Sequence, residues 1–321
     1  MCIVYALVVH VLLLGSIFVI YFRSPVINGL KPHTPFIGYG LEAPANRMVL
    51  IVTDGLRAAS FFEDNCRHVP HLREIFMREG LVGISRTLLK CWKENPIDFD
   101  TVLNRCGHSY SWGAPDILNI FQKLAGENDP RMYFDAYSHD MDFSGKHKTY
   151  ELDEWVFRQV RFLLNRKKDE LRKYQPKTVY LLTSDHGMTD SGSHESGAPH
   201  ETETPFMLWG AGVSRIASTV GARKFVANDE GLQLPLHELE QAQLTPLMSV
   251  LVGLPPPMNN LGTLPTGYMA VSEEYKAMAA HSNALQLLAQ YEKLLEQHRQ
   301  GFFADFLNNF DQLSPEDDYM F

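Results

Sequence analysis

Two apolar segments that each end in an aspartate constrain the fold of this chain more than any other feature. Residues 47–54 read Arg-Met-Val-Leu-Ile-Val-Thr-Asp, and residues 178–185 read Thr-Val-Tyr-Leu-Leu-Thr-Ser-Asp. Continuous apolar runs of this length are typical of strands buried on both faces of a sheet. Gly55 follows the first run, and His186 follows the second. Because open α/β sheets bind ligands beyond the carboxyl ends of their strands, we expect Asp54 and Asp185 at a ligand-binding edge.

Helical patterns lie between and after these strands. Residues 151–172 predict one amphipathic helix, with Leu152, Val156, Val160, Leu163 and Leu164 on a single face. Residues 244–253 predict a short buried helix that ends at Gly253. Helix formers over 272–308 predict a tail helix or a pair of helices. Strands that alternate with helices in this way predict an α/β fold, a sheet flanked by helices.

The N-terminal segment predicts a membrane anchor. Residues 3–22 are apolar apart from His10, Gly15 and Ser16, and a helix of that length spans a bilayer core of about 30 Å. The alternative is a cleaved secretory signal, but the apolar run is longer than a typical signal core and Ser24-Pro25 is a poor cleavage site. We therefore expect a transmembrane helix over 1–23. Arg23 alone would leave the rest of the chain cytoplasmic by the positive-inside rule.

Charge and cysteine content exclude several classes of function. The formal net charge is −9, so the chain lacks the basic surface that nucleic-acid binding requires. The four cysteines form no Cys-x-x-Cys pair, which argues against a zinc knuckle and against a redox motif. One disulfide could form in an oxidising compartment, and the sequence leaves its pairing open.

Five side chains are candidate metal ligands: Asp54, Asp185, His186, His194 and His200. Carboxylate oxygen and neutral imidazole nitrogen are both good ligands for Zn²⁺. A pair of metal ions about 4 Å apart can activate a hydroxyl nucleophile and stabilise the charge on a transferring phosphoryl group. The simpler reading is that the two aspartates only cap the turns that follow them. The occurrence of both Thr53-Asp-Gly-Leu-Arg57 and Ser184-Asp-His-Gly-Met188 in one chain favours the metal site.

The motifs resemble those of the GPI ethanolamine-phosphate transferases, in the same order. They are Thr53-Asp-Gly-Leu-Arg57, Trp92-Lys-Glu-Asn-Pro96, Trp112-Gly-Ala-Pro-Asp116, Thr183-Ser-Asp-His-Gly-Met-Thr-Asp190, Gly192-Ser-His194, and the run from His200 to Gly212. The similarity covers about residues 40–265. Trp-Lys-Glu-Asn-Pro is the more specific element and resembles the type that modifies the first mannose of the glycan.

This resemblance implies an alkaline-phosphatase-like fold with two zinc ions. Asp54, Asp185 and His186 resemble the ligands of one zinc, His194 resembles a ligand of the other, and His200 is a weaker candidate. The implied donor is phosphatidylethanolamine, and the implied acceptor is a mannosylated GPI lipid precursor. The implied location is the endoplasmic reticulum membrane, with the bulk of the chain luminal.

The chain departs from the family pattern at two places. After Gly83-Ile-Ser85, the family's nucleophile segment is missing over 86–91, where Thr87 is the only hydroxyl and a poor candidate. At 175–177, a strand and a loop with two further zinc ligands are missing. The cluster His139, Asp140, Asp142 and His147 is interpreted as a solvated loop and does not replace these two zinc ligands.

These gaps predict an inactive, poorly folding chain. At most one zinc site is well formed, the sheet is incomplete, and the chain ends at Phe321 before the multi-span region of the family. We expect an anchor over 1–23, a catalytic-type domain over 24–265 and a helical tail over 266–321. Two alternatives stay open: a nucleotide pyrophosphatase/phosphodiesterase-like hydrolase, and a non-catalytic, membrane-anchored binding protein.

Overall fold

The structure is a computed structural model. It describes residues 2–22, 26–38, 40–86, 100–114, 118, 130–137, 149–194, 196–214, 225–227 and 233–299. Thr87, the Trp-Lys-Glu-Asn-Pro motif and the 139–147 cluster lie outside these residues.

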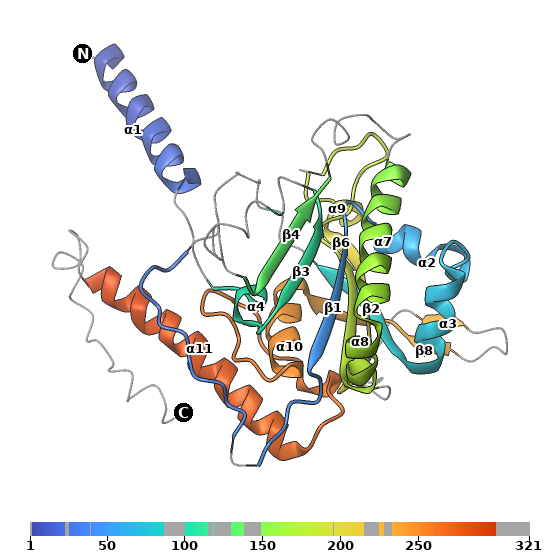
Figure 1. The fold of residues 1–321 in the computed structure, drawn as a ribbon. Coiled ribbons are helices and arrows are strands. Elements are labelled where there is room, and N and C mark those ends of the chain that lie inside the picture. The colour runs from blue at the N-terminus through green and yellow to red at the C-terminus, as the bar shows by residue number, and fades with distance from the viewer. Residues whose placement is uncertain are drawn as a thin grey trace.

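A mixed five-stranded sheet forms the centre of the molecule (Figure 1). Its strand order is β1 (Arg47–Thr53), β5 (Thr178–Ser184), β6 (Glu203–Gly210), β2 (Gly80–Arg86) and β9 (His237–Glu240). β1 runs parallel to β5, β9 runs parallel to β2, and β6 is antiparallel to both of its neighbours. The predicted α/β class and the two predicted strands are thus confirmed.

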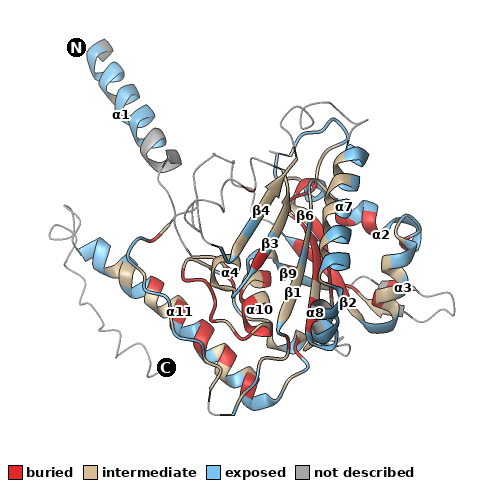
Figure 2. Cartoon of the chain, in the orientation of Figure 1, coloured by how far each residue is buried: buried red, intermediate tan, exposed pale blue. Residues whose placement is uncertain are grey.

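Alternating side chains of the sheet build a core on each of its faces. One core packs Leu81, Leu181 and Leu208 against helix α10 (Leu244–Leu251) and helix α11 (Glu273–Arg299). The other core packs Val82, Leu182 and Met207 against α2 (Ala58–Phe62) and α3 (Pro70–Glu79). Figure 2 shows the buried residues gathered on the inner strands and on the inward faces of α10 and α11. The predicted buried helix over 244–253 is confirmed.

Strand β1 differs from its prediction, because it lies at the edge of the sheet. It pairs with β5 only, among the strands of the described ranges. Leu50 and Val52 on β1 are 38% and 55% exposed, so the prediction of burial on both faces is wrong for this strand. The same prediction is confirmed for β5, which has neighbours on both sides.

The predicted helix over 151–172 is two helices in the structure. Helix α7 (Thr149–Arg166) ends before Lys167, whose ψ of 24° is not helical, and α8 (Lys168–Tyr174) follows. The prediction of one continuous helix is therefore wrong. A 3-10 turn, η2 (Gln175–Lys177), then leads directly into β5. Helix α7 packs beside β3 (Ser109–Gly113), which pairs in parallel with β4 (Met132–Ala136).

Short elements complete the described fold. They are η1 (Glu63–Asn65), α4 (Val102–Arg105), α9 (Pro199–Thr202), β7 (Phe225–Ala227), β8 (Gln233–Pro235), η3 (Gln241–Gln243) and η4 (Thr266–Tyr268). Helix α11 covers 273–299 of the predicted helical region over 272–308, and the residues beyond it are not described.

The N-terminal helix α1 (Cys2–Phe22) extends away from the rest of the molecule (Figure 1). Most of its described apolar side chains between Val4 and Ile17 are exposed. Among the helices that the structure describes, none combines the length and the hydropathy needed to cross a membrane. The helix is present as predicted, and its membrane role stays a prediction.

Candidate metal centre

The pairing of β1 with β5 brings the two predicted aspartates together. Thr53 lies opposite Ser184 in the parallel register, so Asp54 and Asp185 follow adjacent strand ends. The Asp185 N–H donates to the Thr53 carbonyl oxygen at 3.3 Å, which extends the ladder by one residue. Gly55 has a φ of +68°, a conformation that favours glycine, and its N–H donates to Asp185 Oδ1 at 3.3 Å. Backbone geometry therefore places both carboxylates at one edge of the sheet.

Asp54, Asp185 and His186 have the geometry of a three-ligand metal site. One potential ligand atom from each lies within 4.8 Å of the other two. His186 Nε2 is 3.7 Å from Asp54 Oδ1 and 3.6 Å from Asp185 Oδ2. In a tetrahedral zinc site with bonds of about 2.0–2.2 Å, ligand atoms lie roughly 3.3–3.6 Å apart. The three side chains therefore fit a zinc ion with small adjustments.

Hydrogen bonds orient the site's ligand atoms. His186 Nδ1–H donates to the Gly187 carbonyl oxygen at 2.7 Å, which leaves the lone pair of Nε2 facing the carboxylates. Asp185 Oδ1 accepts the His186 N–H at 2.7 Å, which leaves Oδ2 directed at the imidazole. Metal-binding histidines and carboxylates commonly have such secondary partners.

The site is open on one side. The His186 side chain is 10% exposed and that of Asp185 is 29% exposed, whereas that of Asp54 is 82% exposed. Three protein ligands with an accessible fourth position are the usual arrangement of a catalytic zinc, whereas structural zinc is enclosed by four.

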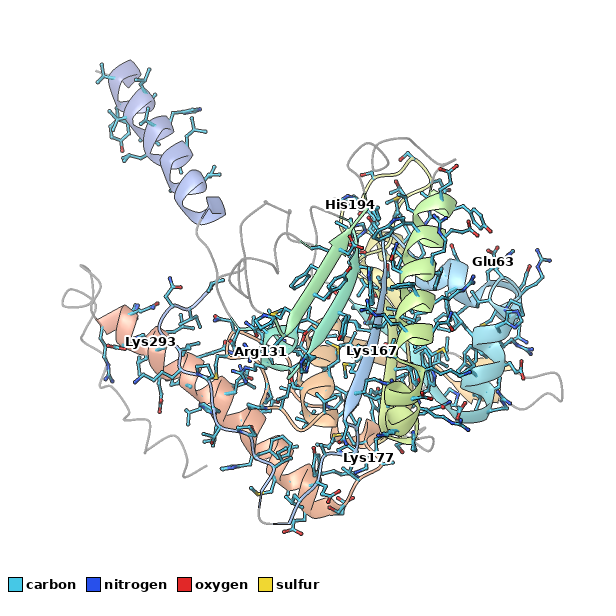
Figure 3. All side chains as sticks on the ribbon, in the orientation of Figure 1. Glu63, Arg131, Lys167, Lys177, His194 and Lys293 are labelled. Atoms are coloured by element: carbon cyan, nitrogen blue, oxygen red, sulfur yellow. The ribbon has the colours of Figure 1, made fainter. Side chains whose placement is uncertain are left out.

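His194 lies beside this group but outside it. Its ring stacks on the ring of His186, with the centroids 4.2 Å apart and the planes at 18°. Figure 3 places His194 at the opposite end of the sheet from Lys177, which precedes β5. The prediction that His194 is a ligand of a second zinc stays a prediction. Its nitrogen atoms do not belong to the cluster formed by Asp54, Asp185 and His186.

His200 contacts the loop that carries His186 through its backbone, and its side chain is exposed. A Cβ atom on Gly187 would lie 2.1 Å from the His200 carbonyl oxygen, so the two loops pack in close contact. Within the described ranges, Asp54, Asp185 and His186 form the sole cluster of three potential ligands.

Two buried residues near the site are not among those predicted from the sequence. Ser184 Oγ accepts the Leu56 N–H at 2.9 Å and lies 2.7 Å from the Thr53 carbonyl oxygen and 2.8 Å from that of His186. Glu201 is buried, and hydrogen bonds from the Ser196 hydroxyl and the Gly197 N–H lower the pKa of its carboxyl. Both brace the loops that carry the ligands. Ser184 belongs to a recognised motif, but a sequence motif gives no contact partners.

The chain is similar along most of its length to curated proteins with one name, GPI ethanolamine phosphate transferase 1. The mouse protein is 31% identical over 96% of this chain and 42% of its own length. The human protein is 31% identical over 92% and 40%, and that of Saccharomyces cerevisiae is 30% identical over 88% and 40%. The chain thus spans about two fifths of the length of these relatives.

The alignment with the mouse protein also reveals gaps. It extends over 396 residues, which exceeds the 321 residues of this chain, so the matched stretch contains positions with no counterpart here. No protein-family model matches the chain. Among solved structures, the lipoteichoic acid synthase LtaP of Listeria monocytogenes gives a TM-score of 0.34 at 10% identity, covering 83% of this chain and 96% of that one. This likeness is too low to support an argument. By sequence, the chain is related over most of its length to the GPI ethanolamine phosphate transferase 1 proteins.

Proposed function

We propose that the chain binds one zinc ion through Asp54, Asp185 and His186. The observation that carries this proposal is the approach of His186 Nε2 to both carboxylates, at 3.7 and 3.6 Å. A zinc ion held there would act as a Lewis acid toward a phosphoryl oxygen. Asp54, the most exposed ligand, would hold the ion on the solvent side, and the buried His186 would hold it from beneath.

The reaction class that the chain derives from is the transfer of ethanolamine phosphate in GPI-anchor biosynthesis. Three lines support it: the shared name of the relatives, the motifs at 53–57 and 183–190, and the position of the cluster at two adjacent strand ends. The proposed donor is phosphatidylethanolamine, and the acceptor is the first mannose of the GPI lipid precursor. The proposed fold is an incomplete alkaline-phosphatase-like domain, in which β1 forms the edge where a further strand is missing.

The chain on its own is inactive in this proposal. A phosphoryl-transfer site of the two-metal type needs a second set of ligands and a positioned hydroxyl. His194 is the single further candidate ligand that the described structure brings beside the cluster. The alignment, which is longer than the chain, supports the loss of internal segments, and their positions near 86–91 and 175–177 rest on the sequence motifs.

Zinc stoichiometry and transferase activity test the proposal together. Isothermal titration of the full chain should give one zinc ion per chain, and Asp185→Asn should abolish tight binding. Asp190→Asn is the matched control, because the Asp190 carboxylate is almost fully exposed and pairs with Arg57 outside the cluster. No transfer of ethanolamine phosphate to a mannosylated GPI lipid should be detected. Two tight zinc ions, or measurable transfer, would refute the proposal.

The proposed location is the endoplasmic reticulum membrane, with α1 as the anchor and the sheet on the luminal side. The exposed apolar side chains of α1 support the membrane anchor, since such a surface is unfavourable in water. Alkaline carbonate extraction of cell membranes should leave the chain in the pellet, and removal of 1–23 should release it. Release of the full chain by carbonate would contradict the anchor.

A further inference from the structure

Gln241 connects the candidate metal centre to the turn between β9 and α10, which lies outside the sequence motifs. It is the first residue of η3, the turn between β9 and α10. Its side-chain Nε2 donates to the carbonyl oxygen of Ser184 at 2.7 Å and to that of Asp185 at 3.0 Å. We propose that Gln241 is a positioning residue that fixes the backbone on which the zinc ligands Asp185 and His186 stand. This inference rests on the proposed zinc site.

The planarity of the peptide bond explains how one amide controls the ligands. The Asp185 carbonyl and the His186 N–H belong to one rigid peptide plane. Gln241 holds the carbonyl side of that plane, and Asp185 Oδ1 accepts the N–H on its other side at 2.7 Å. A rotation of the plane would break this second bond and turn the Asp185 carboxylate away from His186. The amide of Gln241 therefore helps to fix the direction of Oδ2, together with the Gly55 N–H that also donates to Oδ1.

The neighbouring peptide plane connects the same amide to the other strand end. The Ser184 carbonyl accepts from Gln241, and the Asp185 N–H in that plane donates to the Thr53 carbonyl oxygen. Asp54, the third ligand, directly follows Thr53. Gln241 thus stabilises the relative position of the two strand ends that carry all three ligands.

The turn that carries Gln241 is itself held by side-chain amides. Asn260 Nδ2 donates to the Ala242 carbonyl oxygen at 3.0 Å. A Cβ atom on Gly262 would lie 2.1 Å from that same oxygen, so the 260–262 loop packs directly on η3. The position of Gln241 therefore depends on this loop.

Helix α11 holds the loop in turn. Gln286 and Gln290 are buried, and both donate to the Asn260 carbonyl oxygen at 2.7 Å. The Asn283 amide donates to the carbonyl oxygen of Gly262 at 3.2 Å. Buried amides are costly unless they are hydrogen-bonded, and these are paired. We call the residues Gln241, Asn260, Asn283, Gln286 and Gln290 the amide chain.

Zinc affinity of Gln241 variants tests the positioning role. Gln241→Met keeps the length of the side chain and removes both donors, whereas Gln241→Glu keeps the size and places a carboxylate against two carbonyl oxygens. Loss of an outer partner of a metal ligand typically lowers metal affinity about 10–100-fold, and we expect that range for Gln241→Met. The affinity would be measured on the full chain by competition with a chelator, together with the visible spectrum of the Co²⁺-substituted protein.

Tyr275→Phe is the control for a loss of stability alone. It removes the buried hydrogen bond from the Tyr275 hydroxyl to the Val250 carbonyl oxygen, and it lies outside the amide chain. We expect its zinc affinity and Co²⁺ spectrum to equal those of wild type, even if its melting temperature falls. Hydrogen exchange of the metal-free protein gives a second readout, in which Gln241→Met should speed exchange over 184–190 more than in the other strands, whereas Tyr275→Phe should not single out this segment.

The outcomes separate the two proposals. If wild type binds no zinc, the metal centre is wrong, and the positioning role falls with it. If wild type binds zinc and Gln241→Met and Gln241→Glu bind it equally well, the positioning role alone is refuted. If Gln241→Met does not fold, Gln241→Glu and the exchange rates decide in the same way.

Discussion

Gly187 shows how closely single residues are packed around the cluster. Its N–H donates to the Glu201 carbonyl oxygen at 2.7 Å, and a Cβ atom there would lie 2.1 Å from the His200 carbonyl oxygen. Both contacts are with backbone, which cannot rotate away as a side chain does. A methyl group at this position therefore must move the loop that carries His186.

Gly187→Ala should destabilise the fold and weaken zinc binding. Overpacking of a tight site typically costs about 1–3 kcal/mol, and we expect that range in urea unfolding. Gly107→Ala is the matched control, because no atom lies within 4 Å of a Cβ built there. Equal stability of the two variants would show that the loop is looser than the structure indicates.

The pKa of the Cys66 thiol should lie well above that of an ordinary thiol. Burial raises its pKa to about 11, and the charge of Arg73 only partly offsets this effect. The folded pKa thus exceeds an unfolded value of about 8.5, so the contribution of the thiol to stability is present below pH ~8.5 and is lost as pH rises toward 11. Alkylation of native Cys66, followed by mass spectrometry of its peptide, should stay slow at pH 8.5 and become fast in urea. Rapid alkylation of the native protein at pH 8.5 would contradict this.

Among the elements, β1 is the one that leaves an exposed apolar edge. Leu50 and Val52 point to the face that α10 and α11 cover farther along the sheet, and both are exposed at this end. Apart from Arg47 at its start, β1 contains neither charge nor proline, and such strand edges tend to pair with other chains. The exposed edge of β1 therefore offers a specific cause for the predicted poor folding of the chain.

Val52→Lys should reduce self-association with little effect on the fold. A lysine on an edge strand opposes strand addition, and an exposed substitution changes stability by about 0.5 kcal/mol or less. Sedimentation velocity over a range of concentrations would measure the change. Leu181→Lys on β5 is the contrasting variant, since Leu181 is buried and a charge there should prevent folding. Unchanged association of Val52→Lys would exclude the β1 edge as its cause.

The sequence predicts the bounds of the two strands better than their neighbours in the sheet. The composition of 47–54 and 178–185 gives both strands to within one residue of their ends. It does not reveal that β6, an antiparallel strand, separates β5 from β2, or that β1 lies at an edge, because neighbours are a property of the whole sheet. The break at Lys167 was missed because 151–172 contains no glycine or proline to signal it.

At the scale of the whole molecule, α11 and the central sheet share one core. Tyr275 and Ala279 of α11 are buried in the same cluster as Leu181 and Phe206. The proximity of the three candidate ligands could be predicted because each belongs to a local motif at a strand end. The amide chain could not, since Gln241, Asn260 and Gln286 are far apart in the sequence and lie in no recognisable pattern.

A chain that ends before Glu273 should lose its cooperative fold. It lacks the buried side chains of α11, and loss of a single large core side chain costs about 3–5 kcal/mol, against a total stability of about 5–15 kcal/mol. A chain that ends after Arg299 keeps every residue of the two core clusters that the structure describes and serves as the control. Circular dichroism melting should show a sharp transition for the second and none for the first. A sharp transition in both would show that the sheet folds without α11.

The amide chain has a consequence for the compartments in which the site could work. Amide groups neither gain nor lose a proton across the physiological range, so acidification does not alter the bonds that Gln241 donates to Ser184 and Asp185. A brace built from carboxylates or lysines would change its charge with its surroundings. The hydrogen bonds of the amide chain should therefore be the same in a neutral and in a mildly acidic organelle, and any acid sensitivity of the site would have to arise in titratable groups outside the amide chain.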